Sequence, residues 1–146
     1  MWKIKTFNEL NTHELYKILA LRQEVFTIEQ KRLYQDLDKN DFDAIHVFNY
    51  ENNEVIAYAR VFLEDNDVVT FGRVVIKKSH RGKGLGNPLM DKIMQAIRDY
   101  FPEKEIEIEA QVPVKGYYEK YNFRTIGKEF ILAGSPHIKM IHEKIN

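Results

Sequence analysis

Residues 68–111 contain a strand, a glycine-rich loop, a helix and a second strand, and this order constrains the fold more than any other stretch. The first segment, "VVTFGRVVIKK", is rich in β-branched residues, and "EIEIEAQ" at 105–111 alternates acidic and apolar residues. Between them, apolar residues recur at helical spacing until Pro102; they are Leu89, Met90, Ile93, Met94 and Ile97. A crossover long enough to hold a helix predicts two parallel strands with a right-handed connection.

The remaining segments predict antiparallel strands and two further helices. The turn sequences "ENN" and "DND" divide residues 44–78 into three consecutive strands. Period-two alternation indicates three more strands, at 2–7, 123–132 and 137–145. Helical spacing predicts a short helix over 114–121 and a longer one over 12–27, capped by Asn11 and Glu14. The sequence therefore predicts a mixed α/β fold with a mostly antiparallel seven-stranded sheet.

Two segments allow more than one interpretation. The polar stretch 29–43 is predicted to be a loop with one helical turn, and long loops kept by a compact domain are often functional. Glu105, Glu107 and Glu109 share one face of their strand, which is unusual for a parallel strand covered on both sides. Either that face is solvated, or one of its carboxylates lines a cleft.

Length and composition favour a single domain over 1–146, because 146 residues of which 44% are hydrophobic can bury an adequate core. Lys and Arg number 22, as do Asp and Glu, so no overall charge draws the chain to nucleic acid or to an anionic membrane. The sequence has no cysteine, which excludes disulfides and an acyl-cysteine intermediate and fits a reducing compartment. The first residues lack the apolar core of a signal peptide, and no apolar run approaches about 18 residues. We expect a cytoplasmic protein without a membrane span.

The loop "RGKGLG" has the features of an anion-binding site. Gly82, Gly84 and Gly86 permit positive φ, so that successive backbone N–H groups can converge on one anion at the start of the following helix. Five basic residues surround the loop: Lys77, Lys78, His80, Arg81 and Lys83. The spacing matches neither a P-loop nor a dinucleotide fingerprint. A pyrophosphate-binding loop and a solvated glycine turn that caps a helix are the two interpretations.

The loop and its surroundings resemble the GNAT superfamily of N-acetyltransferases. The acetyl-CoA signature of that superfamily is Arg or Gln, two residues, Gly, one residue, and Gly or Ala, and Arg81, Gly84 and Gly86 match it. The downstream "GYYEKYNF" resembles the superfamily's "FYEKLGF" segment, with Asn122 in place of the usual glycine. The early "LRQEVFTIEQ" and "YQDLD" and the late "SPHIKM" look like the ElaA-like branch, so the resemblance covers essentially the whole chain.

The resemblance implies a sheet with helices on both faces that splays around the strands at 68–78 and 105–111, with acetyl-CoA in the wedge. Backbone groups of Val74 and Ile76 would pair with the pantetheine arm like an added strand. Gln111 stands where many relatives have an Asn that contacts pantetheine. The pyrophosphate would be held by the N–H groups of Arg81, Gly82, Lys83, Gly84, Leu85 and Gly86.

Tyr118 stands at the tyrosine that, in the family, protonates the departing thiolate. Its alternative interpretation is an aromatic core residue beside Tyr117 and Tyr121. Because no cysteine is available for acylation, the simplest route is a ternary complex in which the acceptor nitrogen attacks acetyl-CoA directly.

The sequence leaves the acceptor site open. Arg22, Arg60 and Arg73 interrupt apolar segments, which indicates either a carboxylate-binding cluster for the substrate or ion pairs with Glu29 and Asp36. His46 and His137 are candidates for the substrate site, or hydrogen-bonded core residues, and their spacing does not fit a metal site. The candidates for the general base are Glu29, Asp36, Asp38, His46, Glu107, Glu109 and His137.

The predicted function is acetyl-CoA-dependent N-acetyl transfer to a small-molecule or peptide amine. The alternatives are a non-catalytic acyl-CoA-binding module or sensor and, against the neutral charge balance, a nucleic-acid binder that uses the basic loop. A homodimer would be possible if the apolar strand "IKMIHEKI" lay at an edge of the sheet.

Overall fold

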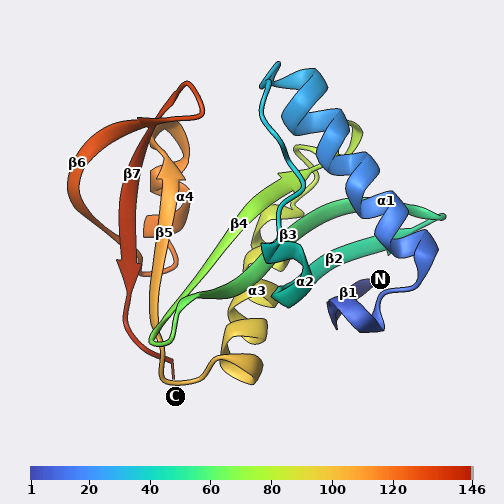
Figure 1. Ribbon diagram of the computed structural model, residues 1–146. Coiled ribbons are helices and arrows are strands. Elements are labelled where there is room, and N and C mark those ends of the chain that lie inside the picture. The colour runs from blue at the N-terminus through green and yellow to red at the C-terminus, as the bar shows by residue number, and fades with distance from the viewer. Residues whose placement is uncertain (146) are drawn as a thin grey trace.

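One seven-stranded sheet organises the chain, and helices cover both of its faces (Figure 1). The computed structural model describes residues 1–145. Its strands are β1 (Trp2–Thr6), β2 (Ile45–Glu51), β3 (Glu54–Asp65), β4 (Val68–Ile76), β5 (Glu105–Gln111), β6 (Arg124–Leu132) and β7 (Ser135–His142). Its α-helices are α1 (Thr12–Arg22), α2 (Asn40–Asp43), α3 (Gly86–Tyr100) and α4 (Lys115–Glu119).

The strand order is β1-β2-β3-β4-β5-β7-β6. In this sheet β4 and β5 are parallel and the other neighbouring strands are antiparallel. The predicted fold class, the meander of β2 to β4 and the parallel crossover through α3 are all confirmed. The crossover matters for function because it brings the glycine loop, at the start of α3, next to the carboxyl end of β4.

The two faces of the sheet carry separate apolar cores. On one face, α3 packs its buried residues, such as Ile93 and Ile97, against Val61, Val69 and Ile106 from three strands. On the opposite face, α1 and the turns after it contribute four buried residues that pack against Phe48, Tyr58 and Val75: Ile18, Leu21, Val25 and Phe26. Figure 1 shows α1 and α3 on opposite sides of β3 and β4.

The start of α1 is fixed by the predicted capping box. The Asn11 side chain accepts a hydrogen bond from the Glu14 amide at 2.7 Å, and the Glu14 carboxylate accepts one from the Asn11 amide at 3.0 Å. Glu14 is 1% exposed, and Lys3 and Lys5 of β1 donate to it at 2.8 and 3.0 Å. The cap therefore also ties α1 to the first edge of the sheet.

Two element boundaries and the position of one strand differ from the prediction. The helix expected over 12–27 changes its winding after Arg22 and continues as a π-helical segment, η2, over Gln23–Glu29. The strand expected over 137–145 begins at Ser135 and ends at His142. The strand proposed as a dimer edge, β7, lies inside the sheet with β5 and β6 on either side, so the prediction of an edge there is wrong. The strand at this edge is β6, which pairs with β7. Alternation along a strand shows which side chains are buried but not which strands lie beside it.

Candidate active site

The two halves of the sheet meet at β4 and β5 and then separate. The two strands pair at Val68↔Glu105 and Val69↔Ile106, near the start of each strand. Beyond these pairs Figure 1 shows β4 and β5 diverging, so the facing backbone edges from Thr70 to Ile76 and from Glu107 to Gln111 have no strand partner. Such an open edge can accept an extended ligand as an additional strand. The predicted splay of the sheet is confirmed.

A bulge in β4 lies beside this wedge. The register with β3 runs from Arg60↔Gly72 to Tyr58↔Val75, so between these pairs β3 has one residue and β4 has two, Arg73 and Val74. Arg73 has a φ of 50°, a left-handed conformation that costs a residue with a side chain about 1–2 kcal/mol. Bulges bend a strand and redirect its backbone groups, and they are frequent beside active sites. Nothing in the alternation of "VVTFGRVVI" indicated it.

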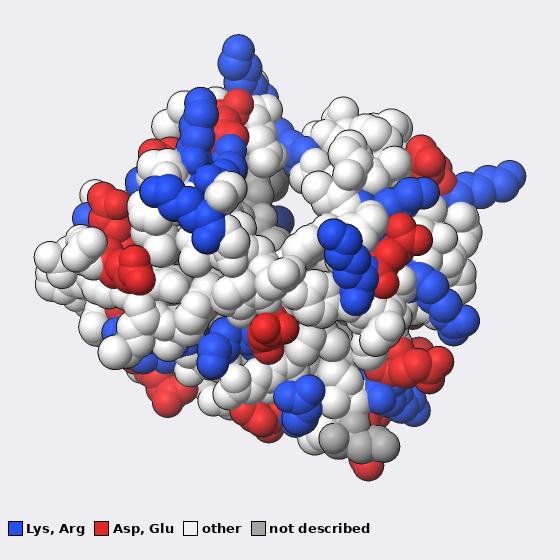
Figure 2. Space-filling model, turned by 180° about the vertical axis from the view of Figure 1, so that it is seen from behind, with Lys and Arg blue, Asp and Glu red and all other residues white. Residues whose placement is uncertain are grey.

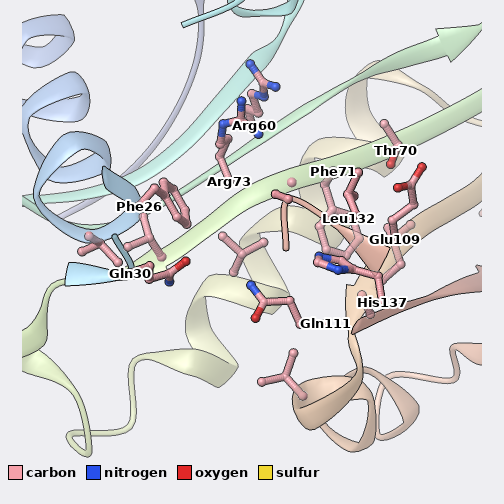
Figure 3. Close-up of a pocket in the computed structure, with 18 of the residues that line it drawn as sticks. Phe26, Gln30, Arg60, Thr70, Phe71, Arg73, Glu109, Gln111, Leu132 and His137 are labelled. Atoms are coloured by element: carbon pink, nitrogen blue, oxygen red, sulfur yellow. The ribbon is translucent and has the colours of Figure 1, made fainter. Parts of the chain in front are cut away.

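A cavity of about 950 Å³ fills the wedge. Figure 3 shows its walls: β4 runs along one side, and Glu109, Gln111 and His137 project from β5 and β7 on the other. The predicted cofactor residues Val74, Ile76, Arg81 and Gln111 line it, as does Tyr118. Figure 2, viewed from behind, shows the molecule hollowed between its two halves, with Lys and Arg side chains gathered around the hollow.

The glycine loop has the geometry of an anion site. Gly82 and Gly84 have φ of 76° and 78°, and a Cβ built on either would meet no atom within 4 Å, so the space beside the backbone is free. None of the amides of Gly82 to Gly86 donates a hydrogen bond within residues 1–145. They lie at the start of α3, a helix of 15 residues whose positive end favours an anion. The loop fits a pyrophosphate.

Arg81 holds the loop in place. Its guanidinium donates to Glu29 at 2.6 and 3.0 Å and to the carbonyl oxygen of Ile76 at 3.0 Å. Its own amide donates to the Lys78 carbonyl at 3.3 Å, so the amides free for a ligand begin at Gly82. Hydrogen bonds from Arg81 lower the pKa of Glu29 below its usual value. Glu29, predicted as an ion-pair partner of the buried arginines, is therefore paired with Arg81 instead.

Tyr118 projects from α4 into the aromatic core on the α3 side of the sheet. It is 8% exposed, and its ring lies 5.8 Å from that of Phe71 and 5.3 Å from that of Tyr117, measured between centroids. Its hydroxyl has no hydrogen-bond partner within the described residues, although the side chain lines the cavity. Burial raises the pKa of Tyr118 to about 12, so the phenol keeps its proton at neutral pH.

Two neighbouring tyrosines fix α4 to the start of α3. Tyr117 donates to the carbonyl oxygen of Gly86, and Tyr121 donates to the Asn87 side chain at 2.9 Å. Asn122, in the turn after α4, has a φ of 70°, the left-handed conformation that its place at a glycine position of the family implied. These contacts set the position of Tyr118 relative to the glycine loop. The sequence showed the tyrosine cluster, and the family resemblance singled out Tyr118 within it.

The three arginines belong to one ion-pair cluster beneath the loop that follows η2. Arg22 donates to Asp41 at 2.8 Å and to Asp36 at 2.9 Å, and it is fully buried. Arg60 donates to Asp38 at 2.6 Å and to Asp41 at 2.9 Å. The ion-pair interpretation is confirmed, with Asp38 and Asp41 as additional partners.

Arg73 completes the cluster. Its Nε lies 2.8 Å from an Asp36 carboxylate oxygen, and Nη2 donates to the Asp36 carbonyl at 3.0 Å. Burial alone would raise the pKa of Asp41, but hydrogen bonds and charge from Arg22 and Arg60 outweigh it and lower that pKa. Three cations and three anions thus fasten the loop over β3 and β4, which Figure 1 shows it crossing on the α1 side.

The two histidines have different roles in the structure. His46 is 1% exposed and uses both ring nitrogens, Nδ1 with the Tyr58 hydroxyl at 2.7 Å and Nε2 with the Asp41 carbonyl at 2.9 Å. Since it does not line the cavity, the core interpretation holds for His46, and its place among the substrate residues was wrong. His137 is 5% exposed and does line the cavity (Figure 3).

Several cavity residues were not predicted. Arg32 and Tyr34 come from the loop after η2, Phe62 and Glu64 from the end of β3, and Leu132 from the β6–β7 hairpin. These residues are far apart in the sequence, and they line one cavity only because the splayed sheet brings their segments near β5. No local sequence pattern could therefore indicate them. Within residues 1–145 no three His, Cys, Asp or Glu side chains form a cluster suited to a metal ion, and no helix is long and apolar enough to span a membrane.

The open wedge, the tyrosine that lines its cavity and the glycine loop that follows Arg81 define an acyl-CoA-dependent acyltransferase. The chain belongs to the GNAT acetyltransferase family: the model of the acetyltransferase (GNAT) domain matches residues 9–144. It is similar to the protein ElaA of Escherichia coli strain K12, with 34% identity over 148 residues, 99% of this chain and 97% of ElaA.

Solved structures show the same relationship. The crystal structure of Escherichia coli ElaA superposes with a TM-score of 0.92, covering 98% of this chain and 99% of that one at 32% identity. That of an acyl-CoA N-acyltransferase from Pseudomonas aeruginosa gives a TM-score of 0.91 at 33% identity, covering 97% of each chain. An aminoglycoside 6'-N-acetyltransferase complexed with coenzyme A gives 0.74 at 14% identity, covering 99% of this chain and 98% of that one, and so shares the fold.

Proposed function

We propose that this protein is an acetyl-CoA-dependent N-acetyltransferase that passes the acetyl group directly to an amine. The observation that carries the proposal is an unpaired strand edge at β4 and a buried protonated tyrosine in one cavity, which Arg81 also lines, with the free amides of the glycine loop following Arg81 directly in the chain. Support comes from the family and from the coenzyme A complex of the aminoglycoside acetyltransferase. The cysteine-free sequence fits a reducing compartment, and we propose the cytoplasm.

Each part of the site has a role in this proposal. Bound acetyl-CoA supplies a thioester carbonyl that an amine can attack. The amides of Gly82 to Gly86 bind the pyrophosphate, and the backbone of Val74 and Ile76 pairs with the pantetheine arm along the open edge of β4. Gln111, at the facing end of β5, adds a side-chain contact to that arm. This fixes the position of the thioester, and positioning supplies much of the rate.

Tyr118 supplies the proton for the departing sulfur. A phenol kept protonated by its surroundings can donate to a thiolate and recover a proton from water afterwards. The sequence has no cysteine to carry the acetyl group, so the acceptor nitrogen attacks the thioester in a ternary complex.

Thiol release from acetyl-CoA and calorimetry of its binding test the proposal together. Gly84→Asp places a negative side chain at a position with φ of 78°, beside the proposed pyrophosphate site. We expect acetyl-CoA binding to weaken at least a hundredfold, with the circular dichroism spectrum preserved. Gly127→Asp, at a φ of 77° in β6, is the control for backbone strain and should bind normally. Equal affinity of Gly84→Asp and wild type would reject the pyrophosphate assignment.

Turnover separates an enzyme from a sensor. Tight acetyl-CoA binding without thiol release in the presence of any amine would favour the non-catalytic acyl-CoA-binding module. Release that depends on the amine added would support the transferase.

A further inference from the structure

His137 presents a free nitrogen to the cavity from the face of the sheet opposite Tyr118. Its neighbours on β7, Ile138 and Met140, belong with Tyr118 to the core on the α3 side, so alternation along the strand turns His137 to the α1 side. Figure 3 shows its ring directed into the cavity near Leu132 and Glu109. A ligand in the wedge would therefore have Tyr118 on one side and His137 on the other.

The hydrogen bonding of His137 determines which nitrogen carries the proton. Nδ1 lies 2.8 Å from the Ser135 carbonyl oxygen, and a carbonyl oxygen only accepts hydrogen bonds. Nδ1 must therefore donate, and in the neutral ring Nε2 is left as an unprotonated acceptor. Within residues 1–145 Nε2 has no hydrogen-bond partner, although the residue is 95% buried. The hydrogen bond at Nδ1 fixes the orientation of the ring, and Nε2 presents its lone pair to the cavity.

Five of the other six candidate bases, all but Glu109, are occupied. Asp36 and Asp38 neutralise the arginine cluster, and Glu29 is paired with Arg81. His46 uses both of its nitrogens in the core. Glu107 lies 3.8 Å from Lys139 and does not line the cavity.

Two carboxylates lie on the same face as His137. Glu109 of β5 and Glu64 of β3 both line the cavity, and neither forms an ion pair within the described residues. Burial first, and then the charges of Glu107 and Glu109, raise the pKa of Glu64, while the charge of Lys139 acts in the opposite direction. A bound cation would relieve the repulsion between these carboxylates.

The cations near His137, apart from Arg32, each face a carboxylate. The guanidinium groups of Arg60 and Arg73 are matched by carboxylates of the cluster. Lys139 faces Glu107. Arg32 donates to the Ser135 hydroxyl at 2.9 Å, between the loop and the β6–β7 hairpin, and is the cavity cation without a carboxylate partner in residues 1–145.

We infer that His137 is the general base of acetyl transfer, and that Glu64 and Glu109 select a primary amine whose molecule carries a second positive charge. This inference rests on the proposed transferase function and adds the base and the class of acceptor to it.

The protons and bonds balance as follows. The acceptor loses one proton to solvent and binds as a neutral amine, with its second cation between Glu64 and Glu109. As the nitrogen bonds to the acetyl carbon, its proton passes to Nε2 of His137, and the carbon–sulfur bond breaks. The sulfur takes the phenolic proton of Tyr118. The imidazolium then returns a proton through water to the phenolate, so the net products are an amide, free coenzyme A and one released proton.

Variants at position 137 test the base. His137→Gln should lower kcat by about 10²–10⁴, the range of general-base catalysis, while acetyl-CoA affinity measured by calorimetry stays within twofold. His142→Gln, on the same strand but outside the cavity, is the matched control and should keep its turnover. Turnover of His137→Gln within twofold of wild type would overturn the assignment.

Imidazole rescue distinguishes a base from a packing residue. In His137→Ala, added imidazole can occupy the vacated space and take the proton, so turnover should rise at least tenfold and saturate with imidazole concentration. A loss of turnover that imidazole does not restore would assign a structural role to His137 and sink the proposal.

A matched amine series tests the acceptor class: butylamine, 1,4-diaminobutane and 4-aminobutanoate. We expect kcat/KM to be at least tenfold higher for the diamine than for butylamine, and lowest for the carboxylate. Glu64→Gln and Glu109→Gln should raise KM for the diamine about three- to tenfold and leave that for butylamine unchanged. Glu105→Gln, which lies on the same face of β5 outside the cavity, should have no effect.

Binding provides a readout that does not need turnover. Calorimetry with the protein saturated with coenzyme A should show the diamine binding more tightly than the other two amines, and the Glu64 and Glu109 variants should lose this preference. A preference for 4-aminobutanoate that Arg32→Gln abolishes would overturn the inference, as would equal binding of all three amines. Neither result affects acetyl-CoA binding at the glycine loop, so failure here is distinguishable from failure of the transferase proposal.

Discussion

The environment of Tyr118 is compatible with both of the roles that its sequence context left open. It is 8% exposed within an aromatic cluster with Phe71 and Phe123, and it also lines the cavity between β4 and β5. The same burial that packs the ring raises the pKa of its hydroxyl to about 12 and so keeps the proton available. Packing and acid catalysis are therefore compatible at this residue.

Removing that hydroxyl should affect turnover more than binding. We expect Tyr118→Phe to lower kcat by about 10²-fold, a typical contribution of one general acid, with the Kd for acetyl-CoA nearly unchanged. The raised pKa also predicts that wild-type activity shows no loss from ionisation of this phenol until the pH approaches about 12. Tyr100→Phe, an exposed tyrosine on α3, is the control. Equal losses of kcat and of cofactor affinity would indicate that the hydroxyl serves packing.

At the scale of elements, the loop between η2 and β2 depends on ion pairs for its position. Asp36 and Asp38 of this segment and Asp41 of α2 form ion pairs with three arginines. These are Arg22 of α1, Arg60 of β3 and Arg73 of β4. A polar surface loop without an apolar core of its own depends on such contacts for a fixed position. It supplies Arg32 and Tyr34 to the cavity wall.

Asp36→Asn should loosen this loop and weaken the acceptor site. The change removes one charge facing Arg22 and Arg73, which leaves buried guanidinium charge in excess at a cost of about 1–3 kcal/mol. We expect amide hydrogen exchange in 31–39 to accelerate at least tenfold and KM for the acceptor to rise severalfold, with acetyl-CoA affinity retained. Asp43→Asn, exposed on α2 and without an ion pair in the described residues, should behave like wild type. Unchanged exchange in Asp36→Asn would show that other contacts hold the loop.

At the scale of the whole molecule, the two halves of the sheet are joined by few contacts at the wedge. The strands β4 and β5 pair over two residues each, and the remaining connection passes through α3, α4 and the core on that side. A ligand lying along both open edges would connect the halves over the rest of their length. Its binding energy would then add to the stability of the folded chain.

Acetyl-CoA should therefore raise the melting temperature. At a concentration of about 100 times Kd, linkage predicts about 2.7 kcal/mol of stabilisation, or about 5–10 °C for a chain of this size. Differential scanning calorimetry with wild type and Gly84→Asp gives the comparison, and the variant should show little shift. An equal shift in both proteins would mean that the ligand binds elsewhere.

The sequence alone determined the local structure, that is, the secondary-structure elements and the turns between them. Alternation, helical spacing and the turn residues defined the strands, the crossover helix and the capping box of Asn11 and Glu14, because these patterns act over a few neighbouring residues. The glycines at 82 and 84 likewise indicated a loop able to adopt positive φ, which both residues have in the structure. Motif resemblance then indicated the family, which the matched domain confirmed.

The tertiary structure decided which of the many polar candidates share one site. His46 and His137 look alike in alternating strands, yet the first has both nitrogens bonded in the core and the second leaves Nε2 free in the cavity. The tertiary structure also decided the carboxylate partners of the arginine cluster and the interior position of β7. In both cases the partner residues lie many positions away in the sequence. Hydrogen bonds and ion pairs have a range of a few ångströms in space, and only the packing of the sheet and its splay determine which groups come within that range.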